Sequence, residues 1–210
     1  ELTKVVESQM CANDWDNINF NHVPSVASSR YKKAFSRHTE KYKEWTSALV
    51  STDPEVKKEV KVNAGAVYPY DVLKGVVDAY GNITYNKSQL NHIIAQWDAL
   101  PNFVGDANIL PLVDVSGSMT CKAGGYQSKS TVTCLDVSVS LGLYLADKNK
   151  GKFKDTFLTF SGSPELLHLQ GNINQKIDQM IKSKWMMNTN INAAFKKILD
   201  VAVKGGVPQE

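Results

Sequence analysis

The hydrophobic pattern of this chain changes its period near residue 100. Before that point, apolar residues recur at spacings of three and four, the period of an amphipathic α-helix. After it, short apolar runs alternate with helical segments, as in strands joined by helices in an α/β sheet. We therefore expect two parts: an all-α segment over residues 1–104 and an α/β domain over residues 105–210.

Within the first part, three helical regions are expected. An apolar stripe from Ala27 to Leu49 predicts one long helix or two joined helices, starting at Pro24-Ser25 and stopping at Asp53-Pro54. Two further helices are expected from Pro69 to a Gly81 cap and from a Ser88 cap to Pro101.

The second part is expected to form an open, mostly parallel sheet. The predicted strands cover residues 108–113, 154–160 and 165–169. The predicted helices cover residues 131–146, 173–181 and 191–201, and the first of these should be buried almost all round, with small residues allowing close packing. Ligands of such sheets bind beyond the carboxyl ends of the strands.

A cluster of hard oxygen donors follows the first predicted strand. Asp114, Ser116 and Ser118 stand at alternating positions, and Gly117 allows a tight turn between them. One carboxylate and two hydroxyls can converge on an ion of the magnesium type, which prefers about six oxygen ligands. A serine-rich turn that binds nothing is the alternative for the same residues.

Residues 109–119, Ile-Leu-Pro-Leu-Val-Asp-Val-Ser-Gly-Ser-Met, resemble the metal-ion-dependent adhesion site of von Willebrand factor A-type (VWA) domains. The resemblance implies a Rossmann-like fold that binds a ligand through Mg²⁺ or Mn²⁺ without catalysis. It also implies a fourth metal ligand from a second loop, which Thr189 matches, beside Asp114, Ser116 and Ser118. An aspartate from a third loop is usual in the family. The sequence ends where the strand before that loop would begin, so we expect a VWA domain truncated before its later strands, with the remainder as missing sequence or a second fragment.

The helical part resembles the end of a TROVE module, the ring of helical repeats in the Ro autoantigen family. Residues 15–25, 31–45 and 63–71 carry this resemblance. The nearest match is a branch of VWA proteins with TROVE-like helices that occurs in phages, bacteria and some eukaryotes. Ro proteins bind small structured RNAs, so the resemblance implies RNA as a partner.

A basic stripe offers a possible contact for such an RNA. Arg30, Lys33, Arg37 and Lys41 are spaced three, four and four apart, within a narrow arc of a helical wheel. They could follow a phosphate backbone, although a solvated helix surface has the same pattern. The net charge of +3 is too small to indicate nucleic-acid binding by itself.

The sequence carries no recognisable catalytic motif, so we do not expect an enzyme. It lacks the Gly-x-Ser-x-Gly elbow and the phosphate-binding Gly-x-x-x-x-Gly-Lys loop, and its four histidines are dispersed. An aspartyl phosphotransferase would need a second carboxylate where Ser116 stands. Three cysteines without zinc spacing indicate reduced thiols and a cytoplasmic protein, and no apolar run approaches bilayer length.

Two functions follow as hypotheses. The first is a Ro-like ribonucleoprotein scaffold that binds structured RNA with a divalent metal. The alternative is a protein-interaction module, phage-encoded or structural, whose metal binds an acidic residue of a protein partner.

Overall fold

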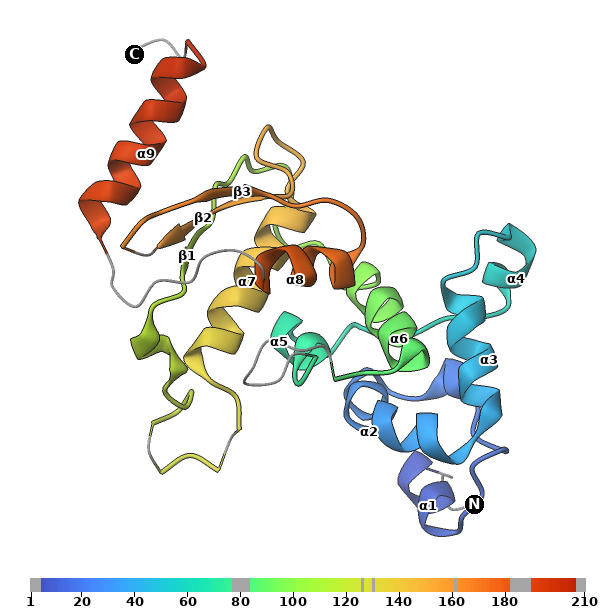
Figure 1. Ribbon diagram of the computed structural model, residues 1–210. Coiled ribbons are helices and arrows are strands. Elements are labelled where there is room, and N and C mark those ends of the chain that lie inside the picture. The colour runs from blue at the N-terminus through green and yellow to red at the C-terminus, as the bar shows by residue number, and fades with distance from the viewer. Residues whose placement is uncertain are drawn as a thin grey trace. The chain divides into compact units, whose positions relative to one another are not determined.

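The computed structural model describes residues 5–76, 84–125, 127–129, 131–160, 162–181 and 190–206. The chain divides into two compact units (Figure 1). The first comprises residues 1–101 with 172–174, and the second comprises residues 102–171 with 175–210. Helices and strands both occur, so the fold is mixed α/β. In the part of the chain that the structure describes, no helix is long and apolar enough to cross a membrane.

Helices are the regular secondary structure of the first unit among its described residues. Its helices are α1 (Val6–Cys11), η1 (Phe20–His22), α2 (Ser25–His38), α3 (Glu40–Leu49), α4 (Pro54–Lys58), α5 (Pro69–Leu73) and α6 (Lys87–Asp98). The stripe that was expected to form one long helix or two joined ones forms two, because the extended backbone of Thr39 (φ −147°, ψ 134°) separates α2 from α3.

Several helix ends differ from the sequence-based expectation. The stop expected at Asp53-Pro54 is wrong: α3 ends at Leu49, and Asp53 caps α4 by accepting a hydrogen bond from the Glu55 amide at 3.0 Å. Asn86, rather than Ser88, caps α6 and forms a capping box with Gln89, which satisfies two amides of the first turn.

Of the helix expected from Pro69 to Gly81, the structure describes residues 69–76, and the helix there covers only Pro69–Leu73. α5 ends at Leu73, and Gly75 follows with a positive φ of 70°, a conformation that glycine adopts without steric cost. The rest of the expected helix, with its Gly81 cap, falls in residues 77–83, which lie outside the described residues.

An aromatic cluster forms the core of the first unit. Phe20 lies between Phe35 and Tyr42, with ring centroids 5.3 Å from each. The fully buried His92 lies beside this cluster and is hydrogen-bonded through both ring nitrogens, to Ser28 Oγ at 3.1 Å and to Tyr42 Oη at 2.7 Å. Burial is the main cause that lowers the pKa of His92, to about 3, so its ring is neutral in the fold.

The second unit contains a three-stranded sheet in the order β1-β2-β3 (Figure 1). Its strands are β1 (Leu112–Asp114), β2 (Thr156–Phe160) and β3 (Leu166–His168), and its helices are η2 (Gly117–Thr120), α7 (Cys134–Lys148), α8 (Ile173–Ile181) and α9 (Ile191–Lys204). β1 and β2 are parallel, but β2 and β3 are antiparallel, so the expectation of a mostly parallel sheet is wrong for the described strands. The short connection between β2 and β3, five residues, explains this pairing, because a parallel pair needs a longer crossover.

Close packing of α7 on the sheet fixes the end of β1. A Cβ on Gly142 would lie 2.3 Å from Val113 Cγ2, so only glycine fits at that approach. Ser138 of the same helix donates a hydrogen bond to the carbonyl of Asp114 at 2.9 Å. The small residues of this helix therefore permit the expected close contact, although Leu141 is 48% exposed and the helix is not buried all round.

A buried ion-pair cluster ties α8 to α7 and β2. The Lys176 ammonium contacts the carboxylate of Asp147 and that of Asp155, the latter at 2.7 Å. Burial by itself lowers the pKa of Lys176, but the hydrogen bonds and charges of both carboxylates outweigh it, and the pKa is raised. This lysine is fully charged at neutral pH and is compensated twice.

Candidate functional site

The loop after β1 brings the three predicted oxygen donors together. Asp114 is the last residue of β1 and pairs in register with Phe160 at the end of the parallel strand β2. Its Oδ1 accepts a hydrogen bond from the Ser116 amide at 2.9 Å, which folds the loop back over the strand end. Ser116 is the residue immediately before the short helix η2. The loop therefore lies at the carboxyl edge of the parallel pair, where α/β sheets bind ligands.

The two serine hydroxyls of this loop converge. Ser116 Oγ and Ser118 Oγ are 2.9 Å apart, close enough for a hydrogen bond between them. Mg²⁺ holds its oxygen ligands at about 2.0–2.1 Å, so neighbouring oxygens of its octahedron lie about 3 Å apart. The spacing of the hydroxyls thus fits one edge of a magnesium octahedron, and the donor set of one carboxylate and two hydroxyls fits a hard cation.

The three oxygen-donor residues differ in their exposure to solvent. Ser116 is buried at 3% exposure, Asp114 is partly exposed and Ser118 is exposed. An ion held here would face solvent on the Ser118 side. The predicted fourth donor, Thr189, lies outside the described residues. Among the residues that are described, no group of three or more His, Cys, Asp or Glu could hold a metal, so the loop is a hydroxyl-rich candidate with one acid.

The four residues of the predicted basic stripe are all exposed, but they do not share one helix. Arg30, Lys33 and Arg37 lie on α2, whereas Lys41 lies on α3 beyond the break at Thr39. The Lys41 ammonium donates a hydrogen bond to the Asp16 carbonyl at 2.9 Å. The single arc drawn on a continuous helix therefore holds for the first three residues only.

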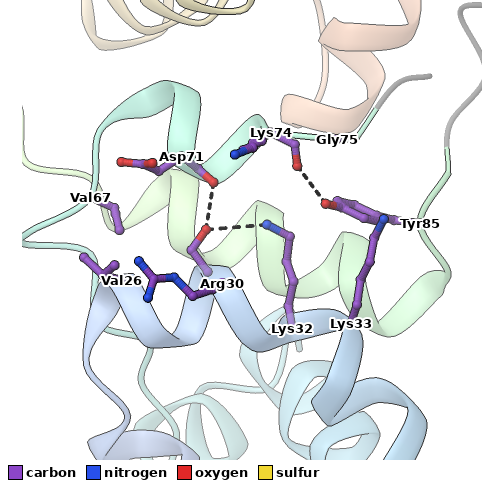
Figure 2. Close-up of a pocket in the computed structure, with 10 residues that line it drawn as sticks. Val26, Arg30, Lys32, Lys33, Val67, Asp71, Lys74, Gly75 and Tyr85 are labelled. Atoms are coloured by element: carbon purple, nitrogen blue, oxygen red, sulfur yellow. Dashed lines mark hydrogen bonds between the residues drawn. The ribbon is translucent and has the colours of Figure 1, made fainter. Parts of the chain in front are cut away.

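Two of the stripe residues border a pocket that the sequence did not indicate. Its volume is about 370 Å³, and Figure 2 shows the side chains around it. Its lining comprises Val26, Ser29, Arg30, Lys32, Lys33, Val67, Asp71, Lys74, Gly75 and Tyr85. Lys32 falls outside the arc of the predicted stripe and was not among the predicted site residues. The signal that was available is the density of basic residues around it, which gives three in the four positions from Arg30 to Lys33.

The three cysteines carry free thiols. Cys121 and Cys134, which flank the segment after the Asp114 loop, place their sulfur atoms 3.6 Å apart. The hydrogen bond with Cys121 is the main cause that raises the pKa of the Cys134 thiol. A raised pKa disfavours the thiolate, so this geometry gives Cys134 no enhanced nucleophilicity.

Comparisons with known proteins divide the chain in two. Residues 1–107 match the family DUF2828, and residues 108–210 match the family DUF7788, each described as a domain of unknown function. The chain is also 27% identical over 214 residues to the uncharacterized protein L728 of Acanthamoeba polyphaga mimivirus, which covers 95% of this chain and 34% of that protein.

The chain thus spans about a third of the length of that viral relative. No solved structure matches the chain. These descriptions assign no activity, and the resemblance to VWA and TROVE modules stays a prediction. Through residues 1–107, which make up half of its length, the chain belongs to the DUF2828 family of domains of unknown function.

Proposed function

We propose that this chain is a non-enzymatic, divalent-metal-dependent binding protein with a VWA-like second unit, and that it serves as a Ro-like scaffold for structured RNA. Asp114, Ser116 and Ser118 would hold Mg²⁺ or Mn²⁺, with Thr189 as a fourth ligand by resemblance. The bound ion would supply an open coordination position for an anionic oxygen of the partner.

One observation carries this proposal: the 2.9 Å approach of Ser116 Oγ to Ser118 Oγ at the carboxyl end of β1. The two hydroxyls are hydrogen-bonded to each other, and the same spacing allows both oxygens to turn toward one cation. A hydrogen bond also fixes the start of the loop to α7, because Ser138 Oγ donates to the Asp114 carbonyl at 2.9 Å. A preorganised donor set of this kind loses little entropy on binding a cation.

Support for RNA as the ligand comes from α2. Its exposed residues Arg30, Lys33 and Arg37 present three cations along one helix face, which suits a phosphate backbone. Replacing all three by Ala is expected to lower the salt dependence of RNA binding, reducing the slope of log K against log salt concentration by about 2.

The first experiment separates metal binding from RNA binding. Isothermal titration of MgCl₂ and MnCl₂ into the chain measures the metal, and fluorescence anisotropy with a labelled RNA hairpin carrying a 3′ tail measures the RNA. We expect both interactions for the wild type, and at least tenfold weaker RNA binding in EDTA and for Asp114→Ala. Asp106→Ala is the matched control, because it removes an exposed carboxylate of the same unit that pairs only with the surface residue Lys150. RNA binding that is equally tight in EDTA would overturn the proposal.

A protein partner is the second candidate, and α9 favours it. Four apolar residues at intervals of four on this helix are strongly exposed: Ile191 at 55%, Phe195 at 62%, Leu199 at 61% and Val203 at 70%. An exposed apolar stripe is more typical of protein contact than of RNA contact. If the hairpin fails to bind but metal is bound, a partner that presents an acidic side chain to the ion becomes the better function.

A further inference from the structure

The pocket of the first unit is built mainly from cationic side chains. Helix α2 contributes Arg30, Lys32 and Lys33, and the fourth cation, Lys74, is the residue that follows α5. Among the described residues of the lining, Asp71 is the one carboxylate. Figure 2 shows the side chains of Lys32 and Lys33 rising from α2 toward Tyr85 and the α5 segment. A cavity lined with four cations and one anion has a strong excess of positive charge.

The carboxylate of Asp71 is hydrogen-bonded to the local backbone. Asp71 Oδ2 accepts a hydrogen bond at 3.1 Å from the backbone amide of Tyr68, the N-cap residue of α5. Its carbonyl accepts a hydrogen bond from Ser29 Oγ at 2.7 Å. Among the described residues, Asp71 forms no ion pair within 4.0 Å with any of the four cations. The excess charge is therefore not cancelled by direct contact.

Lys32 is buried, whereas the other three cations are exposed. Its residue is only 3% exposed, yet among the described residues its ammonium is hydrogen-bonded only to Ser29 Oγ and the Val72 carbonyl, both at 3.5 Å, the outer limit for a hydrogen bond. The ring of Tyr85 lies 5.2 Å from Lys32 Nζ and 4.6 Å from Lys33 Nζ. An ammonium carries three donors, and burial without good acceptors is costly.

The pKa of Lys32 reflects the same surroundings. Burial is the main cause that lowers it, to about 8, and the nearby charges of Lys33 and Lys74 lower it further while Asp71 opposes them. An anion placed in the pocket would reverse the effect of the neighbouring lysines. The site therefore gains electrostatic free energy from an anion that no described side chain supplies.

The chemistry favours a phosphate monoester over a carboxylate. A monoester is close to a dianion at neutral pH and offers three terminal oxygens, which matches several converging N–H donors. A carboxylate offers one charge and two oxygens. A volume of about 370 Å³ lies within the range of small-ligand pockets, so it accommodates a phosphate together with part of the group that carries it.

We propose that the pocket between α2, α5 and Tyr85 binds the phosphate monoester of a phosphorylated ligand, with Lys32 as its buried contact and Arg30, Lys33 and Lys74 around it. The inference goes beyond the proposed metal-dependent function and does not depend on it, because the Asp114 loop takes no part. The terminal phosphate could belong to a free mononucleotide or to the 5′ end of an RNA.

Isothermal titration of the whole chain in EDTA tests this inference without any contribution from a divalent metal. The probes are inorganic phosphate, uridine 5′-monophosphate and uridine. We expect the two phosphorylated probes to bind and uridine to bind at least tenfold more weakly than its monophosphate. Equal binding of uridine and uridine 5′-monophosphate, or no binding of either phosphorylated probe, would overturn the proposal.

Variants locate the binding. Lys32→Met and Lys74→Met are each expected to weaken binding of uridine 5′-monophosphate, by at least tenfold and at least threefold respectively. Lys57→Met is the matched control, because it removes an exposed cation on α4 of the same unit that does not line the pocket, and it should change the affinity less than twofold. An equal loss for Lys57→Met, or no loss for Lys32→Met, would mean that the pocket is not the site.

Two further measurements complete the test. A 5′-phosphorylated oligoribonucleotide that competes with uridine 5′-monophosphate, where its 5′-hydroxyl form does not, would assign the phosphate to RNA ends; failure of both forms to compete would assign it to a free small ligand. Either result keeps the pocket as the phosphate site.

The affinity should also fall between pH 7 and pH 9, as Lys32 loses its proton while the monoester stays dianionic. A pH-independent affinity would contradict the role of Lys32. The groups that face Lys32 are Arg30, Lys33, Asp71, Lys74, Tyr85 and His92.

Discussion

Among the described residues, each of the two units buries one lysine, and the surroundings of the two ammonium groups differ. In the α/β unit, the ammonium of Lys176 contacts the carboxylates of Asp147 and Asp155. In the helical unit, the described contacts of the Lys32 ammonium are a hydroxyl and a carbonyl at 3.5 Å and the ring of Tyr85, with no carboxylate. The pKa moves accordingly: it is raised for Lys176 and lowered to about 8 for Lys32. Burial is similar, at 7% and 3% exposure, so the partners decide the difference.

This difference separates a structural cation from a candidate binding cation. A buried lysine with two carboxylates is a closed cluster, and nothing is gained by adding an anion. A buried lysine without a carboxylate raises the free energy of the folded state unless a ligand compensates it. Proteins keep such costs mainly where function needs them.

The largest expected effect is the loss of the paired lysine. Lys176→Met removes the buried ammonium that the partly exposed carboxylates of Asp147 and Asp155 share, so we expect the free energy of unfolding of the α/β unit to fall by about 3 kcal/mol, the lower end for a buried ion pair. Chemical denaturation followed by amide hydrogen exchange measures this unit by unit. Lys150→Met, which breaks the exposed pair with Asp106, is the control and should cost less than about 1 kcal/mol. A similar cost for both variants would contradict the importance of burial.

His92 is a third buried basic residue, and it tests in the helical unit whether burial lowers a pKa and thereby makes stability depend on pH. Its pKa is about 3 in the fold against 6.5 when unperturbed, so the unfolded chain binds the proton first as the pH falls. Stability is therefore complete above pH 6.5 and decreases below it, by about 3 kcal/mol at pH 4. Denaturation of the wild type and of His92→Gln between pH 7 and pH 4 measures this contribution. An equally steep loss in the variant would assign the acid sensitivity to other groups.

The unpaired lysine should behave in the opposite sense to Lys176. The fall of the Lys32 pKa from 10.5 to about 8 corresponds to about 3 kcal/mol of destabilisation at neutral pH. We therefore expect Lys32→Met to raise the stability of the helical unit at pH 7 by about 2 kcal/mol, since some contacts of the ammonium are lost. The gain should shrink between pH 8 and pH 9.5, because the folded wild type releases its proton in this range before the unfolded chain does. Destabilisation of the unit by Lys32→Met at pH 7 would contradict this account.

The sequence predicted the parts of the fold that depend on local patterns. The helical stripe of α2 and α3, the helix α8 and the approximate positions of three strands follow from period and turn residues. The break at Thr39 was left open, because the apolar period continues through it. The antiparallel β3 was missed, since a short apolar run does not encode the direction of its partner.

The two candidate sites also differ in how far local sequence predicts them. Asp114, Ser116 and Ser118 lie within five residues of one another, so the approach of the two serine hydroxyls was predictable. The pocket was not, because it joins α2 to Lys74 and Tyr85, which lie about forty to fifty residues further along the chain. Lys32 was not predicted as a site residue. Its burial depends on tertiary packing against α5, which helical periodicity alone does not show.

The titration of both buried lysines by NMR tests the comparison most directly. With ¹³C-labelled lysine, and with Lys32→Met and Lys176→Met to assign the signals, the Cε shifts are followed from pH 6 to pH 11 with and without uridine 5′-monophosphate. We predict a midpoint near pH 8 for Lys32 that moves upward with the nucleotide, and a midpoint above 10.5 for Lys176 that does not move. A Lys32 midpoint that coincides with those of the exposed lysines, or that ignores the nucleotide, would contradict the claim that this pocket holds an uncompensated cation for a phosphate.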